Sequence, residues 1–386
     1  MIPFIRQDRD LRVDFFRGIA LWMIFVNHVP GNFLGLLTTR NYTLSDASEA
    51  FVFLAGYAAG LAYGLVLDRQ GWFFAASRVL GRVFTLYVAH IFLLVVFTAQ
   101  VGYSAAALDS AVYLDELNLD PFAQEPYRAL LEALMLRYQP SFLDILPLYI
   151  ALLVLFALFM PLLRHARVML ALSLGAWLLV RWMDWNLPVW RGGEWFFNPL
   201  AWQALFFTGC ALGYRPPGGV PFSVPWRRWI ATLCCLVLLA GATAVLLTTF
   251  QAGYVNETLP GWAGTFLAGI DKASLHPMRL ASMLALAYLF AHGIPRGAAW
   301  LHSRAAAPLV LIGQQALPVF CSGIFLSFVG RVALELSDRW PMQVAVNALG
   351  AAALVAIGLV TAWYAAEKRA PRRPVPPLPT ATLGDS

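Results

Sequence analysis

An arginine and a histidine within the first apolar stretch are the first side chains in this sequence whose spacing indicates chemistry. Arg17 and His28 lie eleven positions apart in RGIALWMIFVNH. On a helix this is close to three turns, so both share one face, about 16 Å apart along the axis. An imidazole can take a proton from a hydroxyl, a guanidinium binds anions, and ionisable groups cost roughly 2.5 to 3.5 kcal/mol inside a bilayer. We therefore interpret both as functional, the alternative for His28 being a hydrogen-bonded core residue.

Two acidic residues begin the second apolar stretch, in the segment DASEAFVFLAGY. Asp46 and Glu49 are one helical turn apart, at a depth similar to that of His28, so we expect a carboxylate to meet the imidazole. Such a carboxylate fixes the tautomer of a general base and stabilises its imidazolium form. The alternative is a helix capping box, which we accept for Asp46 and not for Glu49. The sequence thus predicts His28, Glu49 and Asp46 as catalytic residues, with Glu49 orienting His28.

The third apolar stretch carries two arginines four positions apart, in SRVLGRVFTLYVAH. Arg78 and Arg82 share one helix face at the expected cytoplasmic boundary, and guanidinium groups make forked contacts with phosphate. We therefore expect them to bind a nucleotide-like ligand, with Tyr87 and His90 deeper along the same helix. The alternatives are charges that reach the lipid headgroups, which explains Arg78 equally well, and core packing for Tyr87 and His90.

Further polar residues lie at the starts of two later apolar stretches. Asn198, Trp202 and Gln203 open the sixth stretch, and Lys272 and Arg279 open the eighth. Polar side chains in membrane segments are functional candidates, and we assign these five to binding of an acceptor substrate. The alternative for Lys272 and Arg279 is ion pairing at the outer interface.

The composition requires these side chains to be positioned by membrane helices. The 386 residues are 60% hydrophobic and 12% charged, with a mean hydropathy of +0.67, which excludes a soluble globular protein. A helix needs about twenty apolar residues to cross a bilayer. The sequence therefore predicts an all-α integral membrane bundle of ten spans, at residues 13–37, 46–67, 78–100, 143–164, 167–182, 199–214, 228–250, 273–293, 308–329 and 343–365.

Basic residues orient this bundle, because Lys and Arg are retained on the cytoplasmic side during insertion. They gather at the amino terminus, in alternate connections and in the tail, so we expect both termini in the cytoplasm. The same bias explains a pI near 9.3 without a nucleic-acid partner. We predict one membrane domain at 1–366 with an acidic outer loop at 101–142, and an unfolded Pro-rich tail at 367–386. Within the loop, residues 126–138 have the spacing of an amphipathic surface helix, with a solvated loop as the alternative.

The cysteines argue against a metal site, and the amino-terminal stretch argues against a cleaved signal peptide. All four cysteines lie inside expected spans and none has a metal-binding spacing, so we predict no metal site. Arg17 and His28 interrupt the first apolar stretch, and no small-residue cleavage site follows it. We therefore expect this stretch to be retained as a helix.

Several segments together resemble one known family. The arginine and histidine of R17GIALWMIFVNH28, the acidic SDASEAFVFLAGYAAGL and the arginine-rich start of the third stretch are similar to the membrane acyltransferase-3 superfamily. Within it, WFFNPLAWQALFFTGCALG (195–213), DKASLHPMRLASMLALAYL (271–289) and LIGQQALPVFCSGIFLS (311–327) resemble OpgC-type proteins, which succinylate osmoregulated periplasmic glucans. Two departures concern the arginine pair, whose spacing is one residue longer than the superfamily's Arg-x-x-Arg, and Gln315, near which many OpgC-type chains have a serine.

The resemblance implies an inner-membrane O-acyltransferase that moves an acyl group, such as succinyl from succinyl-CoA, to hydroxyls of a periplasmic glucan. Acyl-CoA would be a co-substrate and no cofactor would be permanently bound. We assign its binding to Arg17, Arg78, Arg82, Tyr87 and His90, and expect direct attack on the thioester without an acyl-enzyme. The alternatives are a transporter or flippase, and an acetyltransferase of another exported polysaccharide. The acyl group and the oligomeric state stay open, with Arg17, Lys272 and Arg279 as candidate partners of a free succinyl carboxylate.

Overall fold

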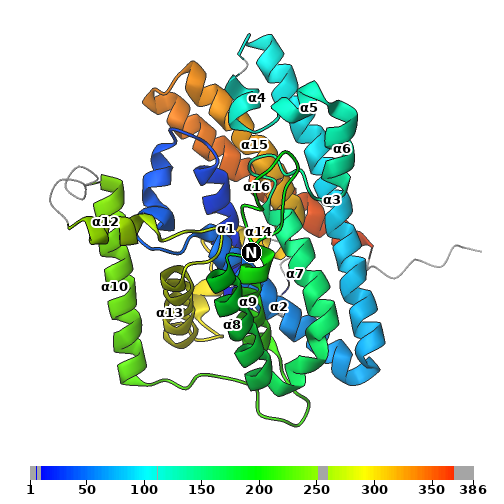
Figure 1. The fold of residues 1–386 in the computed structure, drawn as a ribbon, viewed down its shortest axis with the longest axis vertical. Helices are drawn as coiled ribbons and strands as arrows, with labels where there is room; N and C mark the ends of the chain where they lie inside the picture. The colour runs from blue at the N-terminus through cyan, green and yellow to red at the C-terminus, as the bar shows by residue number, and fades with distance from the viewer. Residues whose placement is uncertain (1–5, 7–9, 111, 251–259, 369–386) are drawn as a thin grey trace, which may run out of the picture.

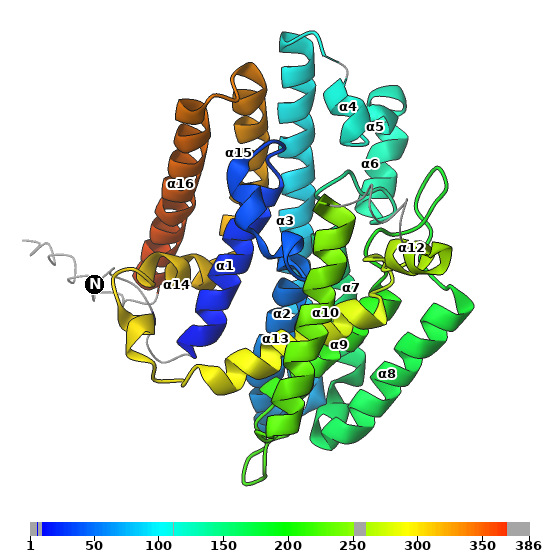
Figure 2. The same ribbon diagram turned by 90° about the vertical axis from the view of Figure 1, so that its left-hand side faces the viewer.

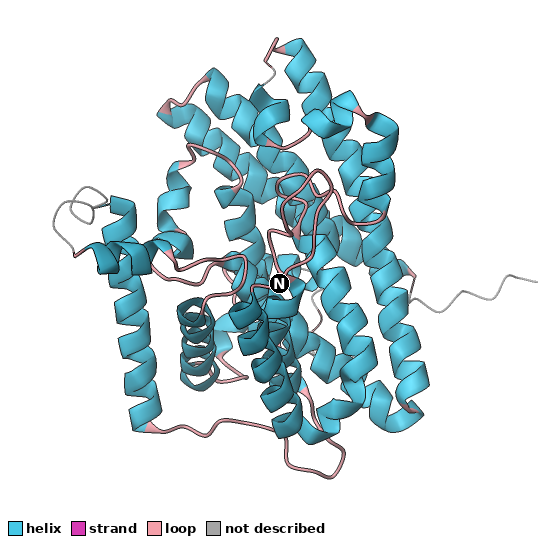
Figure 3. Cartoon of the chain, viewed as in Figure 1, coloured by secondary structure: helices cyan, strands magenta, loops and turns pink. Residues whose placement is uncertain are grey.

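The structure, a computed structural model, describes residues 6, 10–110, 112–250 and 260–368, and most of these residues are helical. Figure 3 shows helices joined by loops and turns, with no strand in these ranges. The predicted tail lies outside them from residue 369 onward. The α-helices are α1 (Leu11–Asn27), α2 (Ala47–Gln70), α3 (Trp72–Ala107), α4 (Val112–Glu116), α5 (Asp120–Gln124), α6 (Pro126–Leu134), α7 (Ile145–Phe159), α8 (Ala166–Met183), α9 (Pro199–Gly213), α10 (Arg228–Phe250), α12 (Gly261–Ala268), α13 (Pro277–Gly293), α14 (Ala307–Gln314), α15 (Ala316–Leu336) and α16 (Trp340–Glu367).

Six helical stretches of the described residues are long and apolar enough to cross a membrane. They are α2, α3, α10, α15, α16 and the continuous stretch 145–183, in which the 3-10 helix η3 (Met160–His165) joins α7 to α8. The all-helical class is therefore confirmed for the described residues, with six candidate membrane spans, whereas ten spans and the side of each terminus stay predictions. Much of α10 and α16 is exposed in the isolated chain, as expected for apolar faces that contact lipid.

Two predicted spans are interrupted. The first, expected at 13–37, ends its α-helix at Asn27, because Pro30 follows and Gly31 adopts φ +74°. The chain continues as two short 3-10 helices, η1 (Phe33–Leu37) and η2 (Thr39–Asn41). The ninth, expected at 308–329, breaks at Gln315 between α14 and α15.

Glycines spaced four residues apart let α2 and α9 cross in direct backbone contact. A Cβ on Gly56 would lie 2.1 Å from the Phe206 carbonyl oxygen, and one on Gly60 would lie 2.1 Å from that of Cys210. Gly209 is equally close to α2, where a Cβ would lie 2.4 Å from the Phe53 oxygen. Small residues at this spacing are typical of tightly packed membrane helices. The crossing fixes α2, which carries the acidic residues of the second apolar stretch.

The outer segment, residues 108–144, gathers beside the upper half of α3 (Figures 1 and 2). It is tied to α15 by Arg331, which contacts Glu116 and lies 2.8 Å from Glu335, while Tyr113 also bonds to Glu335. Its α6 helix confirms helical spacing within the predicted 126–138, and whether it lies on a membrane surface stays a prediction. The segment is therefore a folded part of the bundle, with three helices of its own.

Candidate functional site

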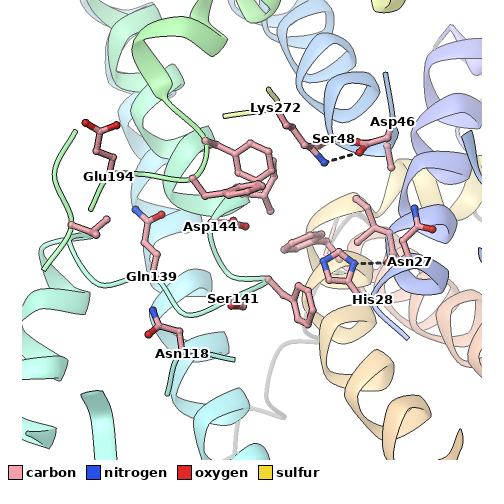
Figure 4. A pocket seen from close by; sticks show the side chains of 18 of the residues that line it. Asn27, His28, Asp46, Ser48, Asn118, Gln139, Ser141, Asp144, Glu194 and Lys272 are labelled. Carbon is pink, nitrogen blue, oxygen red and sulfur yellow. Dashed lines mark hydrogen bonds and ion pairs between the residues drawn. The ribbon is translucent and has the colours of Figure 1, made fainter. Parts of the chain in front are cut away.

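A cavity of about 540 Å³ lies where the end of α1 and the start of α2 meet three connecting segments. Figure 4 shows Asn27, the last residue of α1, and His28, which follows it, on one side, with Asp46, Ser48 and Lys272 near them. The opposite side comes from the outer segment and from the aromatic loop, defined here as residues 184–198. Segments far apart in the sequence thus enclose one space of mixed polarity.

His28 is held at this cavity by the end of α1. It is the C-cap residue, half-buried, and its ring meets that of Phe142 edge-on with centroids 4.4 Å apart. Nδ1 lies 2.6 Å from the carbonyl oxygen of Ile24, one turn earlier. A carbonyl oxygen only accepts hydrogen bonds, so the neutral ring carries its proton on Nδ1 and its free lone pair on Nε2. His28 is thereby arranged as a base with Nε2 as the reactive atom.

Burial keeps this base uncharged. His28 lies beyond the last residue of α1, outside the membrane-length stretches, and burial lowers the pKa of its imidazole. The positive charges of Lys272 and Arg40 act in the same direction, against the bond to Ile24 and the charge of Asp46. A neutral imidazole is the form that can remove a proton from a hydroxyl.

Asp46 and Lys272 form an ion pair in the cavity wall. Asp46 is the N-cap of α2 and accepts hydrogen bonds from the Ser48 backbone nitrogen at 2.8 Å and the Ser48 hydroxyl at 2.6 Å. Lys272 Nζ lies 2.6 Å from Asp46 Oδ2. The two side chains are 17% and 27% exposed, so the pair faces the cavity. The expected capping role of Asp46 is confirmed.

The predicted contact between Glu49 and His28 is wrong. Glu49 is fully buried, and its Oε1 lies 2.8 Å from Nε and 2.6 Å from Nη2 of Arg279. Its other oxygen accepts from the Asp46 backbone nitrogen at 3.0 Å and completes the capping box that we had rejected for it. The capping geometry turns Glu49 back along α2, so the group that orients His28 is the Ile24 carbonyl.

Three residues predicted to bind the acceptor lie behind the cavity wall. Asn198 caps α9, and its backbone nitrogen bonds to the carbonyl oxygen of Ala273 at 3.0 Å. Trp202 is fully buried, with its indole nitrogen 3.2 Å from the carbonyl oxygen of Lys272. Gln203 instead joins α9 to α8. Asn198 and Trp202 thus position the loop that presents Lys272, and Lys272 alone of the five predicted acceptor-binding residues lines the cavity.

The residues assigned to acyl-CoA lie apart from this cavity. Arg17 is buried and donates to the backbone carbonyls of Gly313 at 3.4 Å and Leu54 at 3.3 Å, which ties α1 to α14 and α2. Arg78 is exposed and donates to Gln70 at 3.4 Å. Arg82 is half-buried and makes no hydrogen bond or ion pair with any described residue. None of the three lines the cavity.

Tyr87 and His90 have different surroundings from those expected. The Tyr87 hydroxyl donates to the Leu134 carbonyl at 2.9 Å, so it braces α6 of the outer segment against α3. His90 is fully buried, and within the described part of the chain neither ring nitrogen has a hydrogen-bond partner. The structure thus places both within helix packing.

Sequence reasoning missed the polar wall opposite His28. It contains Asn118, Gln139 and Ser141 of the outer segment, with Asp144 at the start of α7 and Glu194 in the aromatic loop (Figure 4). Burial raises the pKa of the Asp144 carboxyl, which lies just outside the membrane-length stretch. These residues lie in loops and turns, so they do not show the helical spacing by which the other candidate residues were found. The aromatic residues near Asp144 and Glu194 could have indicated a binding site in these loops, because connecting loops commonly carry binding residues.

Comparison with known proteins identifies the family. A sequence model of the family described as OpgC protein matches residues 9–366, which is nearly the whole chain and all the helices above except the last residue of α16. No curated protein and no solved structure matches the chain. The chain belongs to the OpgC family, whose membership points to a membrane acyltransferase for periplasmic glucans.

Proposed function

We propose that the protein transfers an acyl group, succinyl in the first instance, from cytoplasmic acyl-CoA to a hydroxyl of a periplasmic glucan, and that His28 is the general base. The observation that carries this proposal is the state of the His28 ring. Its Nδ1 bonds to the Ile24 carbonyl, so the neutral ring has its free lone pair on Nε2, and the ring lines a cavity large enough for a sugar residue. The proposal places the protein in the inner membrane, with this cavity toward the periplasm.

The proposed step is direct attack on the thioester. The glucan hydroxyl oxygen forms a bond with the acyl carbonyl carbon, and its proton passes to Nε2 of His28. The bond from that carbon to sulfur breaks, and coenzyme A leaves as the thiolate, which takes up a proton. The protonated His28 then returns its proton to solvent. No cysteine lines the cavity among the described residues, and its two serines donate their hydroxyls to protein oxygens, Ser48 to Asp46 and Ser141 to the Glu116 carbonyl, which supports transfer without an acyl-enzyme.

The wall opposite His28 suits a sugar. Phe196 offers an exposed apolar ring, and Asp144 and Gln139 offer oxygen and nitrogen atoms that can bond to hydroxyls. Ligand sites typically combine aromatic walls with a few polar groups that fix orientation. The glucan would therefore enter between the outer segment and the aromatic loop.

The acyl donor would approach from the opposite side. Arg78 and Arg82 lie near the start of α3 with little or no engagement by other side chains, which leaves their guanidinium groups available for phosphate. The pantetheine arm would extend from there through the bundle and carry the thioester to His28. Acyl-CoA would be a transient co-substrate.

The test is acyl transfer by purified protein in lipid nanodiscs supplied with acyl-CoA and a glucan acceptor. We expect free coenzyme A thiol to be released only when both substrates are present, and the glucan to gain acyl ester. A transporter would bind or move a substrate without consuming acyl-CoA, so the absence of thiol release with either acetyl- or succinyl-CoA would overturn the proposal.

A further inference from the structure

Three cationic side chains line the cavity, and they differ in their partners. Lys272 Nζ is 2.6 Å from Asp46, and Arg137 Nη1 is 3.4 Å from Glu132. Arg40 makes no hydrogen bond or ion pair with any residue that the structure describes. The cavity thus contains a guanidinium whose five donors are available to a ligand.

The fold places Arg40 beside the proposed base. After His28 the chain turns through η1 and η2, and the Thr38 hydroxyl donates to the Asn27 side chain at 2.8 Å. Asn27 immediately precedes His28, so this bond returns the chain to the end of α1. Asn41 closes the turn by donating to the Gly35 carbonyl at 2.6 Å. Arg40 lies between these two anchors, and its charge acts on the His28 ring.

The three cations named from the sequence as carboxylate partners already have acceptors in the protein. The Arg17 guanidinium bonds to two backbone carbonyls, Arg279 to Glu49 at 2.6 Å, and Lys272 to Asp46 at 2.6 Å. A ligand carboxylate would have to displace these partners and leave a buried or half-buried charge unpaired, which is costly. Arg40 has no partner among the described residues to be displaced, so a ligand carboxylate can bind it without this cost.

We propose that Arg40 binds the distal carboxylate of a dicarboxylic acyl group and thereby selects that group over a neutral one. This inference rests on the acyl transfer proposed above. A guanidinium matches a carboxylate with two parallel hydrogen bonds, and such bonds are stronger than neutral ones. A short dicarboxylic acyl group holds its carboxylate only a few bonds from the reacting carbonyl, so its binding partner must lie beside the base, as Arg40 does.

The test compares two donors, succinyl-CoA and acetyl-CoA, for the unmodified protein and three variants. Arg40→Gln removes the charge, Arg40→Lys keeps it without the fork, and Arg339→Gln is the matched control. Arg339 is exposed, precedes α16, and lies outside the cavity. We expect Arg40→Gln to lower kcat/KM for succinyl-CoA by about 10- to 100-fold, as for a lost bond between charged groups. Its acetyl transfer should stay within about twofold, Arg40→Lys should recover part of the loss, and Arg339→Gln should change neither.

The outcomes separate this inference from the proposed function. Equal loss with both donors, or unchanged succinyl transfer in Arg40→Gln, would overturn the role of Arg40 and leave acyl transfer intact. An unmodified protein with equal kcat/KM for acetyl-CoA and succinyl-CoA would also overturn the role of Arg40. Failure of the unmodified protein with both donors would overturn the proposed function, and this inference with it. The retained acetyl transfer also shows that the variant is folded.

Discussion

The cavity at the end of α1 and the arginine pair on α3 are organised in opposite ways. At the cavity, His28 and the pair Asp46–Lys272 are each fixed by short bonds to the protein, at 2.6 Å in both cases. On α3, Arg78 has one bond of 3.4 Å and Arg82 has none among the described residues. Fixed dipoles and charges stabilise a reaction without reorganisation, whereas guanidinium groups with few protein partners keep their donors for the phosphates of a ligand. Under the proposed function, this difference fits chemistry at the cavity and donor capture at α3.

The largest expected effect is loss of the base. His28→Ala should lower the rate of acyl transfer by about 10² to 10⁴-fold, because no other described cavity residue offers a neutral imidazole. The measurement is thiol release in the purified system, with size-exclusion profile and melting temperature as controls for folding. A variant that keeps normal activity would remove His28 from the mechanism. The cavity would then no longer differ from the arginine pair on α3 as the place of the reaction.

A second prediction concerns stability, and separates Glu49 from the catalytic group. Glu49→Gln removes the nearer carboxylate of the half-buried Arg279, which keeps only Asp46 at 3.7 Å, and it also replaces a fully buried charge, so it should destabilise the protein by about 1 to 3 kcal/mol. The control is Glu335→Gln, because Glu335 is 42% exposed and its partner Arg331 keeps Glu116. Melting temperature in detergent should fall far more for Glu49→Gln. If stability is unchanged and only activity falls, Glu49 acts on His28 after all.

The third prediction tests the crossing that holds α2 at the cavity. Gly56→Ala places a methyl group 2.1 Å from a backbone oxygen of α9, so the helices must move apart at a cost of about 1 to 3 kcal/mol. Gly175→Ala, on α8 with open space around it, should instead stabilise the protein slightly through helix propensity. Thermal unfolding of the two variants side by side measures this. A stabilising effect at both positions would contradict the packing.

The smallest expected effect is at the donor side. Arg82→Gln should raise KM for acyl-CoA several-fold and leave kcat nearly unchanged, because a phosphate contact that is equal in the ground and transition states affects binding alone. Arg78→Gln, more exposed, should have a weaker effect. Initial rates at varied acyl-CoA concentration distinguish the two constants. A fall in kcat with unchanged KM would place Arg82 with the reacting atoms and remove the contrast between the two regions.

Helix positions were predictable, while side-chain partners were not. The apolar stretch 46–67 became α2 at Ala47–Gln70, and 228–250 became α10 with the same bounds, because length and hydropathy act locally. His28 and Asp46 were found because charged and polar residues are rare in such stretches. The partner of Glu49 was missed because Arg279 approaches from a helix more than two hundred residues away. Asn118 and Asp144 were missed because only the folded outer segment brings them to the cavity.

The most direct measurement of the central claim is mass spectrometry of periplasmic glucans from cells that carry the intact gene, lack it, or carry His28→Ala. The account predicts acylated glucan in the first case, unmodified glucan in the other two, and normal membrane levels of the variant protein. Acylated glucan in cells that contain only the His28→Ala protein, at the level found with the intact gene, would contradict it.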